Sequence, residues 1–369
     1  MIDPLRLKKL LQRMIDIYSP SGKEEDLLYY LKGYLKRRGL KVQAQPVDDN
    51  RYNLVLAPDD RDIQLAFVGH LDTVTAYDLE QYSYVEKGDE IMGLGAADMK
   101  GGCAAMIEAF MAFTGSASQV LPVALCLVVG EEETGDGAAQ LMKQYRFPWA
   151  VIGEPTALVP CFKSYGYVET QISAEGKRLH ASLAGRRKNS VETLLGRLLK
   201  VTHFFEHNHP GLIYNIRDLY TIPAGFAVPE YSEAWIDIHL PPGASTGEII
   251  TELDEMVSFR DRANPGINVL FRTETIDAGY DLPDKGLAAD ILKSVYQERG
   301  LAWKTDAFRS HSDANQIFAS GARPILLGPG CLEKAHVQDE SVPLAEVQAA
   351  AEIYLSLMQR FFADPSSSS

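Results

Sequence analysis

The first 160 residues of the chain alternate between two hydrophobic patterns. Apolar residues at helical spacing predict helices over 7–18, 24–39 and 98–113, with Ser21 as a candidate N-cap for the second. Unbroken apolar runs are typical of strands buried on both faces of a sheet. The predicted strands cover residues 41–47, 53–57, 63–69, 123–130 and 149–153. This alternation predicts an α/β fold with a mostly parallel sheet flanked by helices.

The pattern changes between residues 164 and 273. Strands with alternating apolar and polar residues, separated by helices, predict an antiparallel sheet covered by helices on one face. The predicted elements are strand 164–176, helix 190–207, strand 232–240, helix 246–259 and strand 267–274. The first pattern then resumes with helix 286–300, strand 323–328 and helix 344–362. We therefore expect a domain formed by 1–163 and 274–369, interrupted by an inserted α+β domain over 164–273.

Composition narrows the class of protein. A chain of 369 residues exceeds what one core usually holds, which agrees with two domains. A formal net charge of −14 argues against nucleic acid as a partner. No apolar run approaches the ~20 residues of a membrane span, and the N-terminal segment lacks the pattern of a signal peptide. The four cysteines are scattered without CxxC spacing, so we expect a cytoplasmic protein without disulfides.

Histidines and carboxylates follow the predicted strands of the first domain. In open parallel sheets the carboxyl ends of the strands form the edge where ligands bind. The candidate residues at this edge are His70, Asp72, Asp98, Glu131, Glu132, Glu154 and His336. His with Asp or Glu is the ligand mix that zinc or a similar divalent ion prefers, and this set is large enough for two ions that share one carboxylate. Such ions would offset the repulsion among the adjacent acids 131–133.

The motifs around these residues resemble a known family. They are GHLDTV, GAADMKGG, GEEETG, GEPT and GPGCLEKAHVQDE. Together they resemble the di-zinc aminoacylase and carboxypeptidase family, which includes acetylornithine deacetylase, acetyl-lysine deacetylase, succinyl-diaminopimelate desuccinylase and glutamate carboxypeptidase. The resemblance covers nearly the whole chain, and the last motif is most similar to the deacetylase branch. It implies a zinc-peptidase-like domain with a ferredoxin-like lid and dimerisation domain.

The resemblance also implies roles for the candidate residues. Asp98 would bridge two ions, with His70 and Glu154 completing one site and Glu132 and His336 the other. Glu131 would be the general base, and Asp72 the partner of the second nitrogen of His70. In the inserted domain, EGKRLHAS resembles the lid motif of the family, so His180 would stabilise the tetrahedral oxyanion from the partner subunit of a homodimer. Zinc is the expected ion, although cobalt and manganese share this ligand set.

Two positions depart from the family pattern. Phe226 stands where many relatives carry an Asn that holds the substrate, and His239 where they carry an Arg. A His cannot reproduce the two parallel bonds of an Arg to a carboxylate. Either the substrate differs or other cations hold its carboxylate. The candidates are Arg186, Arg187, Lys188 and Arg309, although the sequence favours a solvated surface charge for each of these four. His311 is a further candidate, which either lies near the cleft or away from it.

The sequence therefore predicts a metal-dependent amide hydrolase. We expect an N-acyl-amino-acid deacetylase of the acetylornithine or acetyl-lysine type, acting on a small molecule. The close alternative is a carboxypeptidase or dipeptidase of the same family. A third alternative, from another class, is a catalytically silent homologue that binds an acylated ligand.

Overall fold

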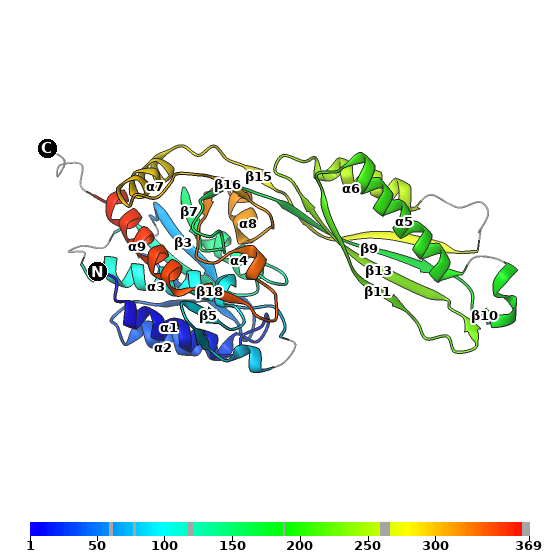
Figure 1. Cartoon of the computed structure of the whole chain (residues 1–369), viewed down its shortest axis with the longest axis horizontal. Helices are drawn as coiled ribbons and strands as arrows, with labels where there is room; N and C mark the ends of the chain where they lie inside the picture. The colour runs from blue at the N-terminus through cyan, green and yellow to red at the C-terminus, as the bar shows by residue number, and fades with distance from the viewer. Residues whose placement is uncertain (59–61, 77–78, 117–120, 187–188, 259–265, 364–369) are drawn as a thin grey trace. The chain divides into compact units, whose positions relative to one another are not determined.

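The chain divides into two compact units (Figure 1). This computed structural model describes residues 1–58, 62–76, 79–116, 121–186, 189–258 and 266–363. Unit 1 comprises Met1–Phe162, Leu282–Phe308 and Ser312–Ser369, and unit 2 comprises Lys163–Asp281 and Arg309–His311. Each unit has a hydrophobic core of its own.

The centre of unit 1 is a sheet in the order β1-β2-β6-β3-β7-β17-β8. The four inner strands β6, β3, β7 and β17 are parallel, whereas the edge pairings β1–β2, β2–β6 and β17–β8 are antiparallel. Their bounds are β1 (Gln43–Pro46), β2 (Tyr52–Leu56), β3 (Leu65–His70), β6 (Val123–Val128), β7 (Trp149–Ile152), β8 (Cys161–Ser164) and β17 (Arg323–Leu326). Every residue of β3, β6 and β7 is buried, as the unbroken apolar runs predict. A short strand, β16 (Asp306–Phe308), also pairs with β8.

Helices cover this sheet in two groups. Helix α3 packs against α1 and α9, which also contacts α7, and α4 packs against α8. The bounds are α1 (Pro4–Ile15), α2 (Glu25–Lys36), α3 (Gly101–Thr114), α4 (Asp136–Gln144), α7 (Leu287–Glu298), α8 (Asp313–Ala319) and α9 (Leu344–Phe361). All residues of α3 from 101 to 110 are buried. They are apolar or glycine except Glu108, whose buried carboxylate is paired with Arg6. The expected α/β fold with a parallel core is confirmed.

Smaller elements complete unit 1. A three-stranded sheet has the order β18-β5-β4. The remaining bounds are β4 (Val85–Lys87), β5 (Glu90–Met92) and β18 (Ser341–Pro343), with single turns at Leu79–Tyr82, Ala96–Lys100 and Leu332–Lys334. The prediction of Ser21 as N-cap of α2 is wrong. The cap residue is Glu24, and the Ser21 hydroxyl instead donates to Asp72 Oδ2 at 2.6 Å.

Unit 2 has the order of elements of a ferredoxin-like fold. Its main chain runs β9 (Gly166–Glu175), α5 (Ser190–Asn208), β11 (Ile213–Thr221), β13 (Tyr231–Leu240), α6 (Thr246–Ser258) and β14 (Asn268–Asp277). This is a β-α-β-β-α-β unit, and its antiparallel sheet has the order β11-β13-β9-β14. The apolar positions of β9 and β13 pack against α5 and α6. The ferredoxin-like prediction is confirmed, although β11 is not among the predicted strands.

Two further short pairings involve residues of unit 2, and the second of them is the β15 edge of the large sheet. Strand β10 (Leu179–His180) pairs with β12 (Ala227–Val228), and a short 3-10 helix covers Ala181–Arg186. Strand β15 (Tyr280–Asp281) pairs with the last two residues of β8. In neither unit does a described helix have the length and apolar character that a membrane span requires.

Candidate active site

The cluster of acids and histidines begins at the carboxyl end of β3. His70 Nδ1 lies 3.1 Å from the carbonyl oxygen of Asp72. Because a carbonyl oxygen only accepts, Nδ1 carries the proton, and Nε2 faces the acids. Nε2 lies 3.1 Å from Asp98 Oδ1, 3.9 Å from Glu131 Oε2 and 4.0 Å from Glu154 Oε1. The backbone therefore holds Nδ1, and Nε2 is left facing the carboxylates.

Asp98 lies between the two histidines. Its Oδ1 contacts His70, and its Oδ2 lies 3.5 Å from Nε2 of His336. His336 also contacts Glu132, with 3.0 Å between Nε2 and Oε2. The backbone of His336 has a φ of 58°, a left-handed conformation that is uncommon for residues other than glycine. Strained backbone of this kind clusters at functional sites, where the surrounding structure holds it in place.

Asp72 contacts more groups than the single predicted partner, His70. Its carboxylate lies 3.6 Å from His70 Nδ1, whereas its oxygens accept hydrogen bonds from the backbone nitrogens of Glu131 at 3.2 Å and Glu132 at 3.0 Å. The Ser21 hydroxyl is a third donor. The turn that carries the two acids is therefore tied to the end of β3. Gly130, with a φ of 74°, provides the left-handed turn after β6.

Glu154 follows β7 and is buried beside the first turn of α3. A Cβ on Gly102 would lie 2.1 Å from the carbonyl oxygen of Gly153, so only glycine allows this close approach. Oε1 of Glu154 is buried and has no hydrogen-bond partner among the described residues. A buried carboxylate oxygen without a partner is costly, and a cation would satisfy it.

Burial dominates the electrostatics of the cluster. It raises the pKa of Glu131, Glu132 and Glu154 above the usual range of a glutamic acid. Burial also lowers the pKa of a histidine, but hydrogen bonds to acids outweigh this effect at both imidazoles. Contacts with Asp72 and Asp98 raise the pKa of His70 well above its ordinary value, and Glu132 raises that of His336 to about 9.

One residue that the sequence analysis does not single out is buried beneath Asp98. The Glu340 carboxylate accepts hydrogen bonds from the backbone nitrogens of Gly95, Ala97 and Asp98 at 2.9–3.0 Å. Burial raises the pKa of Glu340 to about 7, although these N–H groups act against the rise. Glu340 is the last residue of the motif GPGCLEKAHVQDE. The motif itself does not indicate that the Glu340 side chain contacts the turn that carries Asp98.

His180 lies in unit 2 and is exposed. Its Nδ1 contacts the Ser182 hydroxyl at 2.9 Å. It pairs with Ala227 in the β10–β12 ladder, so it is a neighbour of Phe226, whose side chain is 93% exposed. These two positions are 46 residues apart in the sequence, and the β10–β12 pairing of unit 2 brings them together.

His239 belongs to an aromatic cluster in unit 2. The ring of Tyr167 stacks on that of His311 at 4.2 Å between centroids and lies 5.4 Å from that of His239. The Tyr167 hydroxyl donates to Asp237 Oδ1 at 2.9 Å. Burial lowers the pKa of His239, so the imidazole is neutral near pH 7 and is no substitute for a guanidinium.

The other candidate cations give less information. Arg309 is exposed. Arg187 and Lys188 lie outside the described residues, as does the side chain of Arg186.

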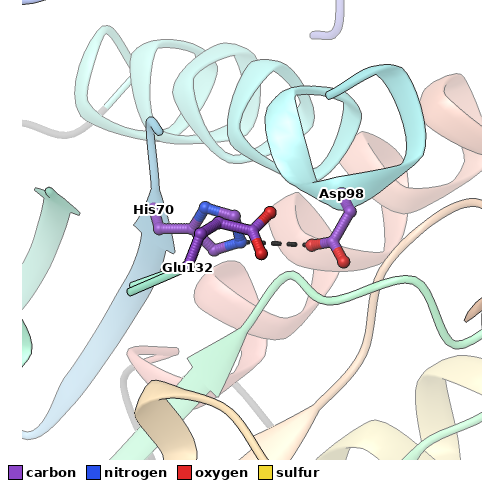
Figure 2. Close-up of side chains that lie close together, drawn as sticks. All are labelled: His70, Asp98 and Glu132. Atoms are coloured by element: carbon purple, nitrogen blue, oxygen red, sulfur yellow. Dashed lines mark hydrogen bonds and ion pairs between the residues drawn. The ribbon is translucent and has the colours of Figure 1, made fainter. Parts of the chain in front are cut away.

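The residues of unit 1 fit a divalent-metal centre. His70, Asp98 and Glu132 each offer one ligand atom, and these atoms lie within 4.8 Å of one another (Figure 2). Among the described residues, the ion-pair partners of the cluster's carboxylates are His70 and His336, not Lys or Arg. Buried acids need compensating positive charge. A parallel sheet with this cluster at its edge and a ferredoxin-like insertion define a two-domain metallohydrolase.

Comparison with known proteins agrees with this class. Residues 66–360 match the family described as Peptidase family M20/M25/M40. The chain is 26% identical over 356 residues to an acetylornithine deacetylase of Photorhabdus laumondii, which covers 91% of this chain and 90% of that relative. The chain belongs to the M20/M25/M40 peptidase family, and it is a metal-dependent hydrolase of amide bonds.

Solved structures share the fold. A tripeptidase from Staphylococcus aureus superposes with a TM-score of 0.81 at 20% identity, covering 98% of this chain and 99% of that one. Human carnosine dipeptidase 1 superposes with a TM-score of 0.76 at 13% identity, covering 97% of each chain. At these identities the similarity concerns the fold and not the substrate.

Proposed function

We propose that this protein is an N-acyl-amino-acid deacetylase of the acetylornithine or acetyl-lysine type that uses two divalent ions. The observation that carries the metal part is the position of Asp98, which has one carboxylate oxygen near each of two histidines. His70 and Glu154 would hold one ion, Glu132 and His336 the other, and Asp98 would bridge them. Zinc fits this ligand set, and cobalt and manganese are accepted by the same donors.

The bound ions would polarise the amide carbonyl and lower the pKa of the attacking water. Glu131 is the proposed general base, because it lies beside this set without being needed to complete it. It takes the proton of the water as the carbonyl is attacked, and it then delivers a proton to the departing amine. Asp72 keeps Glu131 and Glu132 in position through their backbone nitrogens.

The deacetylase assignment draws on the relatives at about 25% identity, several of which are acetylornithine deacetylases. A dipeptidase or tripeptidase activity is the second candidate, because proteins with those activities share the fold. Both reactions cleave an amide bond with the same chemistry. They differ in the part of the substrate that is attached to the amide nitrogen or to the amide carbonyl. Hydrolysis of a panel of N-acetyl-amino acids and dipeptides separates them, and hydrolysis of dipeptides alone would refute our preference.

Unit 2 is the proposed lid and dimerisation domain. His180 would donate a hydrogen bond to the tetrahedral oxyanion. The edge strand β11 exposes Ile213, Leu219 and Tyr220, and exposed apolar edge strands are sites of association. We infer that two copies associate along this strand. Light scattering of the wild type and of Leu219→Lys tests this inference, with a dimer expected for the first and a shift toward monomer for the second.

Substrate selection is the part of the function that departs from the usual family pattern. Neutral His239 favours a substrate group other than a carboxylate at that position. Exposed Phe226, next to His180, would offer an apolar surface where relatives carry an amide. His239→Arg tests this idea. If a substrate carboxylate is held at this position, the variant should have a lower KM than the wild type. Our proposal predicts that the KM is not lowered.

A further inference from the structure

Three backbone nitrogens of the turn that carries Asp98 donate to one carboxylate, that of Glu340. Oε1 of Glu340 accepts from the nitrogens of Ala97 at 2.9 Å and Asp98 at 3.0 Å, and Oε2 accepts from Gly95 at 3.0 Å. Three converging backbone N–H groups form an anion-binding nest. In this protein the anion is a side chain of the protein itself, and it is 2% exposed.

Glu340 is held in place from both sides along the chain. Its carbonyl oxygen accepts from Gly93 N at 3.1 Å, and the register of β18 with β5 pairs the next residue, Ser341, with Met92. Its own nitrogen donates to the carbonyl oxygen of Val337 at 3.2 Å, which closes the turn directly after His336. Glu340 therefore links the segment that carries Asp98 to the segment that carries His336.

This link acts on the residue that the two proposed metal sites share. The Asp98 carboxylate contacts His70 through Oδ1 and His336 through Oδ2. A shift or rotation of the 95–98 turn would move both oxygens together. Loss of an ordinary ligand would disturb one site, whereas loss of the group that orients the shared ligand would disturb both.

We propose that Glu340 is a positioning residue that fixes Asp98 as the shared ligand, so that the binding of both ions depends on it. This inference rests on the proposed two-ion function. It differs from a general contribution to stability, because it specifies which binding events change. Groups that orient metal ligands typically contribute about 10- to 100-fold to affinity.

The test is calorimetric titration of the metal-free full-length protein with zinc chloride, which does not depend on turnover. Glu340→Gln keeps the shape of the side chain but replaces one acceptor oxygen by an amide that clashes with a backbone N–H. We expect both zinc affinities to fall about 10- to 100-fold. Glu340→Asp keeps the charge on a shorter side chain and should give a smaller loss at both sites, and it serves if the first variant does not fold.

Two comparison variants make the result specific. Asp339→Asn removes the same charge from the exposed neighbouring residue and should leave both affinities unchanged. His336→Ala removes a proposed ligand of one ion and should weaken chiefly that ion. The inference is overturned if Glu340→Gln binds both ions as the wild type does, weakens one ion only, or lowers thermal stability without changing either affinity. A wild type that binds no zinc would instead refute the proposed function.

Discussion

The carboxylate of Asp72 accepts a hydrogen bond from the backbone nitrogen of Glu132 at 3.0 Å, across 60 positions of the chain. The same carboxylate accepts from the nitrogen of Glu131 at 3.2 Å. Asp72 therefore fixes the turn that carries a proposed metal ligand and the proposed base, while its carbonyl oxygen orients His70. One residue at the end of β3 organises three groups of the site.

Asp72→Asn should reduce activity without abolishing metal binding. The amide keeps one acceptor oxygen and places an NH2 group against a donor, so the turn at 131–132 loses part of its support. We expect kcat to fall roughly 10- to 100-fold with little change in KM. Ser21→Ala, which removes only the third donor to this carboxylate, should have a smaller effect. Equal losses in the two variants would count against the positioning role.

Glu131→Gln tests whether Glu131 acts as a general base or as a metal ligand. The amide cannot take a proton, so we expect kcat to fall roughly 10²- to 10⁴-fold while the metal content stays at the wild-type value. Elemental analysis alongside the assay checks both parts. Glu133→Gln is the matched control, because Glu133 is exposed in the same run of acids and should be silent. Loss of metal from Glu131→Gln would make Glu131 a ligand.

His180→Ala tests the oxyanion role proposed for unit 2. Removal of one such donor typically costs about 10²- to 10³-fold in kcat. His207→Ala, an exposed histidine of α5 whose Nδ1 contacts a carbonyl oxygen of the same helix, should leave kcat unchanged. A wild-type kcat for His180→Ala would remove this residue from the proposed mechanism.

The pH dependence of the free energy of unfolding should include a contribution from His239. Burial lowers its folded-state pKa below the ordinary value of about 6.5, so below that pH the unfolded chain binds a proton that the folded chain does not. As the pH is lowered from about 6.5, the free energy of unfolding should therefore decrease more steeply in the wild type than in His239→Phe. The extra decrease should end once the pH is below the folded-state pKa of His239. Urea unfolding between pH 5 and 8 measures the difference, and parallel curves would contradict it.

Strands that are buried on both faces could be predicted from the sequence almost to the residue. The run 123–130 is apolar without interruption, and β6 occupies Val123–Val128. Strand β11 could not be predicted in this way. Its side chains are exposed at nearly every position, so its sequence shows no alternation of buried and exposed residues. Its pairing with β13, rather than its own hydrophobicity, makes it a strand.

The candidate ligands could be found from their positions after strands, but their supporting contacts could not. Ser21 reads as a helix cap because its spacing from α2 suits one, yet its hydroxyl donates to Asp72, 51 positions away. Glu340 contacts a turn more than 240 positions away. Contacts over such distances depend on the packed fold and have no local signal. The close approach of Gly102 to Gly153 is of the same kind.

Metal content, measured with hydrolysis of N-acetyl-ornithine and N-acetyl-lysine before and after chelation, tests the central claim most directly. The account predicts two divalent ions per chain, release of acetate, loss of that activity when the ions are removed, and recovery when zinc is restored. A protein that takes up no metal on resupply, or that hydrolyses these substrates equally well without it, would contradict the account.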